Sequence, residues 1–233
     1  MTVMSGKGVT LTTDSAPTID RLEGDTSQNC ESTRLWHAIG DEPYKCYIDI
    51  GAGHPTNLNV GKLFYDRGWF GVNVEPGPYG DLYDEARPND VIVRDVISDH
   101  FGMVKWSTSP VHPDLSGVGS GLEQKFSITL DMLRHDYYSA QCATFVKVDV
   151  EGHELEVLQG ADWDGWLPEV WCIEAIDAAT LQPNHHEWEP ILLDHGYEFA
   201  YFDGINRFYN VKHRPDIGER LRVKLPTMKE YPA

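Results

Sequence analysis

Residues 44–55 read YKCYIDIGAGHP, and this stretch decides the fold. The apolar run 44–50 predicts a buried strand that ends at a glycine turn, and residues 58–68 predict an amphipathic helix closed by Gly68. A strand that passes through a glycine turn into a helix is typical of Rossmann-like sheets, in which ligands bind at the carboxyl ends of the strands. We therefore expect a ligand at this turn.

An acidic residue distinguishes this turn from a dinucleotide-binding turn. The dinucleotide fingerprint G-x-G-x-x-G needs a glycine at position 56, where the chain has Thr56. Asp49 precedes the turn, and a carboxylate there repels a pyrophosphate but suits a cationic ligand such as S-adenosylmethionine. NAD and a turn without any ligand are the alternatives. The candidate cofactor-binding residues are Asp49, Gly51, Ala52 and Gly53.

Strands and helices alternate along most of the chain. Further strands are predicted at residues 70–75, 91–97, 144–150 and 169–175, and further helices at residues 29–40, 79–87, 153–159 and 187–195. This alternation predicts an α/β three-layer sandwich with a mostly parallel sheet. Two last strands, at residues 197–202 and 207–211, flank a tight Asp-Gly turn and predict an antiparallel C-terminal hairpin.

The length of 233 residues fits one domain with short extensions. We expect a flexible N-terminal arm over residues 1–28, a catalytic domain over residues 29–211 and a C-terminal tail over residues 212–233. Residues 99–143 interrupt the alternation of strands and helices. A segment of that length inside a compact domain predicts a lid or a substrate-binding insertion.

The charge of the chain limits its partners. There are 37 acidic and 19 basic residues, which give a formal net charge of −18. That surplus of acid argues against nucleic acid and against an anionic membrane surface as partners. No apolar run reaches the length of a membrane span, and the N-terminus lacks the apolar core of a signal peptide. The four cysteines are far apart, as expected for a reducing compartment, so we expect a cytoplasmic protein.

Acidic residues also end the second and third predicted strands. Glu75 follows the glycine turn at roughly the 20-residue offset of a ribose-binding acid, and Pro76 comes next. Asp95 and Val96 lie near the end of the third strand, where an adenine ring would be bound. We therefore expect all four residues to contact the cofactor.

Residues 145–154, FVKVDVEGHE, hold the densest group of titratable side chains. Asp149 ends a strand, and Glu151 and His153 precede a helix, so we expect all three at the reaction site. Asp149 is also a candidate cofactor-binding residue, since its carboxylate could hold the ammonium group of the cofactor. Histidine can accept a proton from a hydroxyl near neutral pH. Glu174, at the end of the fifth strand, offers a second hard oxygen ligand beside Asp149. A divalent metal at this pair is an alternative that we do not favour.

Four residues are candidate contacts for the substrate. His54 lies in the glycine turn, Trp106 in the insertion, and His186 and Trp188 in the segment after the fifth strand. Aromatic rings of this kind stack on sugar rings. The alternatives are solvated loop positions for the histidines and core positions for the tryptophans.

The motifs IDIGAG, GVNVEP, VISDHFG and KVDVEGHELEVLQG resemble those of FkbM-type S-adenosylmethionine-dependent methyltransferases, over about residues 44–209. The resemblance implies a Rossmann-like class I methyltransferase fold with seven strands, and O-methylation of sugars and other natural products. Many members read G-A-N-x-G in the first turn, where this chain reads GAGHP. The resemblance implies that Asp49, Gly51 and Gly53 hold the methionine part of the cofactor, that Glu75 holds the ribose, that Asp95 and Val96 flank the adenine, and that Asp149, Glu151 and His153 line the reaction site.

These observations together predict an O-methyltransferase that acts on a sugar or a sugar-containing natural product. The ending FDGINRFY resembles relatives attached to glycosyltransferase modules, so we consider a glycosyltransferase module as a partner, and a homodimer as a second arrangement. Two rival interpretations remain open. They are an NAD-linked oxidoreductase and a non-catalytic module that accompanies a glycosyltransferase.

Overall fold

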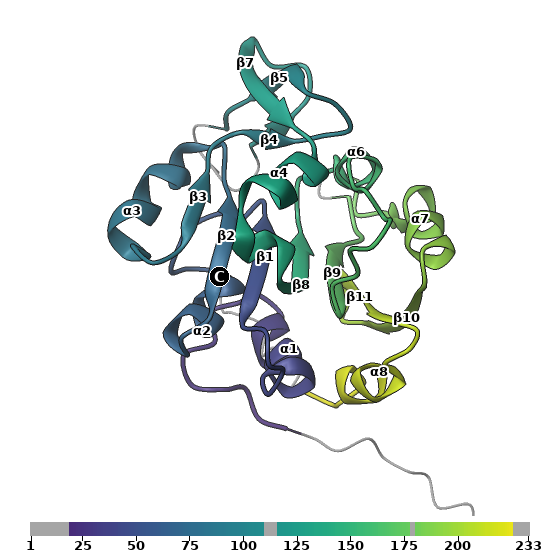
Figure 1. The fold of residues 1–233 in the computed structure, drawn as a ribbon. Coiled ribbons are helices and arrows are strands. Elements are labelled where there is room, and N and C mark those ends of the chain that lie inside the picture. The colour runs from purple at the N-terminus through teal and green to yellow at the C-terminus, as the bar shows by residue number, and fades with distance from the viewer. Residues whose placement is uncertain (1–18, 110–115, 178–179, 226–233) are drawn as a thin grey trace, which may run out of the picture.

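The centre of the structure, a computed structural model that describes residues 19–109, 116–177 and 180–225, is a seven-stranded sheet (Figure 1). Its strands are β1 (Cys46–Ile50), β2 (Phe70–Val74), β3 (Val91–Val93), β8 (Ala143–Val148), β9 (Val170–Glu174), β10 (Tyr197–Phe202) and β11 (Asn206–Val211). Their order across the sheet is β10-β11-β9-β8-β1-β2-β3. The first five are parallel, and β11 runs antiparallel to both β9 and β10. The predicted mostly parallel sheet with an antiparallel C-terminal hairpin is confirmed.

Helices cover both faces of this sheet, as a three-layer sandwich requires. One face carries α1 (Glu31–Ile39), α2 (Gly61–Asp66) and α8 (Pro215–Leu221). The other carries α4 (Leu130–Asp136), α5 (Tyr138–Gln141), α6 (Glu154–Gln159) and α7 (Glu189–Asp194). Three shorter helical segments are η1 (Pro78–Leu82), α3 (Tyr83–Ala86) and η3 (His185–Glu187). None of the helices in the described residues is long and apolar enough to cross a membrane.

Alternation along β1 explains why the two cores are separate. Side chains of a strand point to opposite faces in turn. Tyr47 therefore packs in the core under α1, α2 and α8, while Ile48 and Ile50 pack in the core under α4 to α7. The aromatic rings of Tyr47 and Phe145 stack with centroids 5.4 Å apart, which ties β1 to β8 on the first face.

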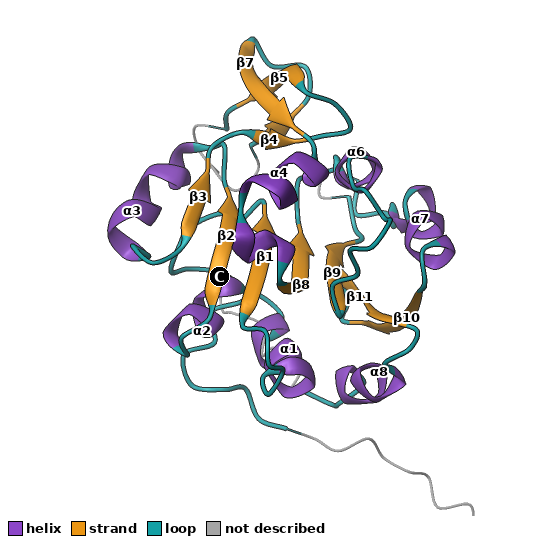
Figure 2. Ribbon diagram, in the orientation of Figure 1, coloured by secondary structure: helices purple, strands orange, loops and turns teal. Residues whose placement is uncertain are grey.

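The segment predicted as a third strand, residues 91–97, is in fact two strands in different sheets. Arg94 and Asp95 separate β3 from β4 (Val96–Ile97). β4 joins a second sheet of order β4-β7-β5-β6, which also contains β5 (Gly102–Ser107), β6 (Gly117–Val118) and β7 (Glu123–Ile128). Figure 2 shows this second sheet beyond the carboxyl ends of β1, β2 and β3. The predicted insertion thus contains a small sheet, and its later part, α4 and α5, belongs to the main sandwich.

The ordered domain extends past both predicted boundaries. Within the segment expected to be a flexible arm, Asp25 accepts hydrogen bonds from the backbone N–H and the hydroxyl of Thr33, at 3.0 and 2.5 Å. Within the segment expected to be a tail, Ile217 and Leu221 of α8 are fully buried against α1. The rest of the predicted arm and tail, residues 1–18 and 226–233, lies outside the described residues.

Candidate active site

A cavity of about 320 Å³ opens between the carboxyl ends of the central strands and the second sheet. From the main sheet come the loops that follow β1, β2 and β8, together with the end of β9. From the second sheet and its loops come Val96, Ile97, Trp106, Ser116 and Val118. The sequence-predicted residues that this cavity brings together are Gly51, Ala52, Gly53, His54, Glu75, Pro76, Val96, Trp106, Asp149, Glu151, His153 and Glu174.

The glycine turn fits tightly against the end of β8. Gly51 and Gly53 have φ angles of 74° and 61°, a left-handed backbone that favours glycine. A Cβ atom at Gly51 would lie 1.7 Å from the carbonyl oxygen of Asp149, so no side chain fits there. The backbone N–H groups of Gly51 and Ala52 donate to the carbonyl of Val74, at 3.0 and 3.1 Å. The turn is therefore fixed between the ends of β2 and β8, and it faces the cavity.

Glu75 connects two backbone turns at the cavity wall. Its Oε2 accepts a hydrogen bond from the N–H of Gly53 at 2.8 Å, and its Oε1 accepts one from the N–H of Gly77 at 2.6 Å. Burial raises the pKa of Glu75, while these two N–H groups oppose that rise. A carboxylate has about four acceptor positions. Glu75 can therefore still accept hydrogen bonds from ribose hydroxyls.

Asp49 lies behind the turn rather than in the cavity lining. Its side chain is 1 % exposed, and neither carboxylate oxygen has a hydrogen-bond partner among the described residues. Burial raises the pKa of Asp49, and the nearby Lys147 and Arg87 lower it. Asp49 therefore could influence a ligand in the cavity through its charge, and not through direct contact.

Sequence reasoning missed Lys147, which lines the cavity. Its ammonium Nζ donates to Asp149 Oδ2 at 2.9 Å and lies 3.8 Å from Asp49 Oδ1. Burial alone would lower the pKa of Lys147, but Asp149 and Asp49 together raise it above its ordinary value. The available signal was a charged residue inside β8, whose other side chains are apolar or threonine.

Three carboxyl groups gather at the floor of the cavity. Oxygen atoms of Asp149, Glu151 and Glu174 lie within 4.8 Å of one another. Burial, followed by the charges of Asp149 and Glu151, raises the pKa of Glu174 to about 10. Glu174 therefore carries a proton at neutral pH and shares a hydrogen bond with Asp149. The spacing suits a divalent cation, although the Lys147 ammonium already occupies one oxygen of Asp149.

The loop between β8 and α6 has an unusual backbone that presents Glu151 to the cavity. Glu151 and Gly152 have φ angles of 56° and 93°, and a positive φ is uncommon for glutamate. Glu154 holds the loop from inside, because its Oε1 accepts the N–H groups of Val150 and Gly152 at 3.3 and 3.1 Å. Burial raises the pKa of Glu154 to about 6. Glu154 is thus a structural residue of the site.

His153 lines the cavity with both ring nitrogens engaged. Nδ1 lies 3.3 Å from Glu156 Oε2, and Nε2 lies 3.0 Å from the Ser98 hydroxyl. Burial lowers the pKa of His153, while Glu156 opposes that change. The imidazole is therefore neutral near pH 7, and its orientation is fixed by its two neighbours.

On the side of the second sheet, Trp106 lies close to the loop that follows β2. Its side chain is 5 % exposed, and a Cβ atom at Gly77 would lie 4.0 Å from its ring. Asp95, expected beside the adenine, does not line the cavity, because it belongs to the short connection between β3 and β4; Val96 and Ile97 line it instead.

Two predicted substrate contacts lie elsewhere. Trp188 is 1 % exposed and packs in the core, with its ring centroid 5.9 Å from that of Tyr209. Trp188 is buried because it stands at the start of α7, where its apolar side chain faces the sheet. His186, on η3, is exposed and is absent from the cavity lining.

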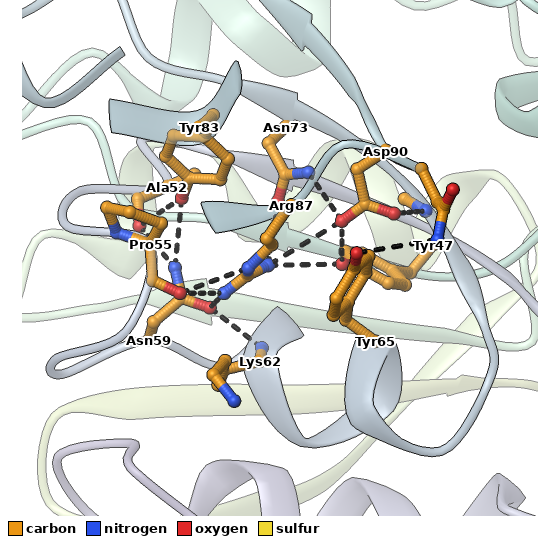
Figure 3. A network of polar contacts seen from close by, with 12 residues as sticks. Tyr47, Ala52, Pro55, Asn59, Lys62, Tyr65, Asn73, Tyr83, Arg87 and Asp90 are labelled. Atoms are coloured by element: carbon orange, nitrogen blue, oxygen red, sulfur yellow. Dashed lines mark hydrogen bonds and ion pairs between the residues drawn. The ribbon is translucent and has the colours of Figure 1, made fainter. Parts of the chain in front are cut away.

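A buried polar network supports the cavity from behind (Figure 3). Arg87 is 1 % exposed and donates to the carbonyl of Pro55 and to the side chain of Asn59. Asn59 in turn donates to the carbonyl of Ala52 at 2.7 Å. The same guanidinium lies 3.7 Å from Asp90. Arg87 therefore fixes the loop between β1 and α2, on which the glycine turn depends.

The chain matches one known protein family and is similar to two solved structures. A model of the methyltransferase FkbM domain matches residues 49–199. The chain is similar to the solved structure of methyltransferase FkbM from Methylobacillus flagellatus KT, with a TM-score of 0.43 and 16 % identity over 71 % of this chain and 43 % of that one. It is also similar to magnesium protoporphyrin IX methyltransferase from Synechocystis PCC 6803, solved with bound S-adenosylmethionine, with a TM-score of 0.41 and 13 % identity over 76 % of this chain and 74 % of that one. The chain thus spans less than half the length of the first of these proteins. No curated protein matches the chain.

Proposed function

Because the chain belongs to the FkbM methyltransferase family, we propose that it transfers a methyl group from S-adenosylmethionine to a hydroxyl group of a sugar or a sugar-containing natural product. The seven-stranded sheet has the Rossmann-like class I methyltransferase fold. The observation that carries the proposal is the glycine turn, which is held at the cavity between Glu75, directly after β2, and Asp149, directly after β8.

The residues at the turn fit the parts of the methyl donor. S-adenosylmethionine supplies an electrophilic methyl group on a positively charged sulfur. The cavity wall beside the turn carries the carboxylates of Glu75, Asp149 and Glu151, which suit a cation. Glu75 has acceptor positions left for the ribose hydroxyls. The apolar side chains of Val96 and Ile97 offer a surface for the adenine ring.

The chain's own residues then orient the acceptor and receive its proton. His153 is neutral and held at Nδ1 by Glu156, so its Nε2 can accept a proton from an acceptor hydroxyl that takes the place of the Ser98 hydroxyl. Asp149 and Glu151 lie beside it at the same edge of the sheet. Transfer from a good leaving group depends mainly on positioning, which rigid strand ends provide.

The charges of the cavity lining also limit which acceptors can bind. Lys147 is the one Lys or Arg side chain among the described residues that line the cavity, and its ammonium is bound to Asp149. A phosphate or carboxylate on the acceptor would therefore meet carboxylates without a free cation. A neutral acceptor such as a glycan or a glycoside fits best, in agreement with Trp106, whose ring can stack on a sugar. A glycosyltransferase that supplies the glycoside is the partner we propose.

The proposal is tested by ligand binding and then by transfer. Calorimetry should show binding of S-adenosylmethionine and S-adenosylhomocysteine, and mass spectrometry of the purified protein should detect co-purified S-adenosyl ligand. Labelled methyl groups should then appear on neutral glycosides from a panel of acceptors. Binding of NAD instead of the S-adenosyl ligands would indicate an oxidoreductase. Binding of neither would indicate a non-catalytic module.

A further inference from the structure

Lys147 places a positive charge beside a site proposed to bind a positively charged cofactor. The side chain is 8 % exposed and lines the cavity. Its ammonium is 2.9 Å from Asp149 Oδ2, on the cavity side, and 3.8 Å from Asp49 Oδ1, behind the glycine turn. A buried ammonium requires such partners, because an unpaired charge is costly to bury.

The position of this charge is fixed by the sheet. Lys147 on β8 and Asp49 on β1 are direct partners in the parallel register, so their side chains point to the same face. The N–H of Asp149 donates to the carbonyl of Ile50 at 2.9 Å, which holds the next carboxylate at the same edge. The ammonium and the two aspartates therefore form one fixed group at the wall of the cavity.

The ammonium offsets part of the negative charge that the cavity would otherwise present. With Lys147 absent, Asp49 and Asp149 would both act on the sulfonium of the methyl donor without a counter-ion. Methyl transfer to a neutral hydroxyl disperses the charge on sulfur, and the product, S-adenosylhomocysteine, has none. Excess negative charge would thus stabilise the bound donor more than the transition state, and binding of that kind slows the reaction.

We propose that Lys147 sets how strongly the site prefers the positively charged methyl donor over its uncharged product. The inference rests on the proposed function, since it requires both S-adenosyl ligands to bind in this cavity. The donor and the product share the adenine, the ribose and the amino-acid group, so the contacts to those parts cancel in a ratio of affinities. The ratio of the Kd of S-adenosylhomocysteine to the Kd of S-adenosylmethionine isolates the charge on sulfur.

The experiment measures this ratio by calorimetry in the full chain. Lys147→Met removes the ammonium but keeps the length of the side chain, and should raise the ratio at least tenfold, the smallest effect expected for unit charges within about 10 Å of each other in a protein. Lys147→Arg keeps the charge and should keep the wild-type ratio. Lys105→Met removes an equal charge from the outer face of β5 and is the matched control, with no expected change.

A second variant tests the inference if Lys147→Met does not fold. Asp49→Asn removes a negative charge that does not touch the cavity, which leaves the ammonium less neutralised, and should lower the ratio at least threefold. A ratio unchanged in Asp49→Asn, or in a folded Lys147→Met, overturns the inference and makes Lys147 a structural counter-ion. Failure of both ligands to bind the wild-type chain would contradict the proposed function instead.

Discussion

Glu75 Oε2 accepts the backbone N–H of Gly53 at 2.8 Å, so the acid at the end of β2 holds the glycine turn at the end of β1. The second oxygen of the same carboxylate accepts the N–H of Gly77. One side chain thus fixes the two loops between which a nucleoside would bind. A residue expected only to contact a ribose also determines the shape of the pocket.

This double role predicts a large effect of Glu75→Ala on cofactor binding. Charge-assisted hydrogen bonds contribute about 1.5–3 kcal/mol each, so the affinity for S-adenosylmethionine should fall about ten- to hundredfold in calorimetry. Glu85→Ala, at an exposed position of α3, is the control and should bind like the wild-type protein. Equal affinity in the two variants would remove Glu75 from the binding site.

We expect His153→Gln to abolish turnover while S-adenosylhomocysteine still binds, because the imidazole serves the acceptor and not the cofactor. Since burial lowers the pKa of His153, its neutral form persists to a pH below the usual value of about 6.5. The rate should therefore stay level above that pH and fall only below it. His135→Gln, on the exposed side of α4, should retain the full rate. Wild-type turnover in His153→Gln would contradict the assignment.

A chelator tests whether the carboxyl groups of Asp149, Glu151 and Glu174 bind a metal ion or are held together by protons and by Lys147. Because Glu174 has a pKa raised to about 10, chiefly by burial, a glutamine resembles its protonated form at neutral pH. Glu174→Gln should therefore keep most of the turnover, and EDTA should leave the wild-type rate unchanged. Loss of activity in EDTA with recovery in Mg²⁺ would instead identify Asp149, Glu151 and Glu174 as metal ligands.

The network around Arg87 predicts a loss of stability. Arg87→Met leaves the carboxylate of Asp90 buried without its cation, and such a change costs about 3–5 kcal/mol in the free energy of unfolding. Arg94→Met makes the same substitution at an arginine whose ion pairs are exposed, and it should lower the free energy of unfolding by about 1 kcal/mol or less. Denaturant titration measures both. An equal loss in the two variants would show that the network contributes little.

Glu31 makes stability depend on pH. Burial, followed by the charge of Asp203, raises its pKa from about 4.5 to about 7, so between these values the folded state holds a proton that the unfolded state has released. Its contribution to stability is therefore present at pH 4.5 and lost as the pH rises to 7, by about 2–3 kcal/mol.

Glu31→Gln should remove this dependence. Denaturant titrations at pH 5 and pH 8 should show a smaller loss of stability in the variant than in the wild-type protein across that range. Glu23→Gln, at an exposed position, should behave like the wild-type protein. Parallel pH profiles for the wild type and both variants would contradict the shifted pKa of Glu31.

The main sheet could be predicted from the sequence because its strands are mostly apolar and several of them end at glycine or acid. The second sheet could not. β5 alternates between exposed and buried side chains, with Val104 and Trp106 inward, but the pattern covers only a few residues after Gly102. The split between β3 and β4 has no signal in the run VIVRDVI, since a two-residue connection resembles a continuous strand.

The site was predictable where a side chain stands at a strand end. Glu75 and Asp149 reach the cavity for that reason. Asp49 stands one residue before the end of β1, so it points to a face of the sheet and not into the cavity. Gln28 lines the cavity from a segment expected to be an arm, and only the tertiary fold reveals this.

The cavity is lined by two parts of the chain, the main sheet and the second sheet, and each is held together by its own strand pairing. Gly51 lies against the carbonyl of Asp149, and the side chain of Glu75 accepts the N–H of Gly53 in the same turn, so substitutions at these positions disturb one another. Trp106 and Val118 belong to a separate sheet inserted after β3, whose own pairing does not depend on those contacts. Under the proposed function, acceptor preference can therefore diverge among descendants of this chain, or be redesigned by exchanging β5, β6 and β7, while Val96, Ile97 and the methyl-donor half stay as they are.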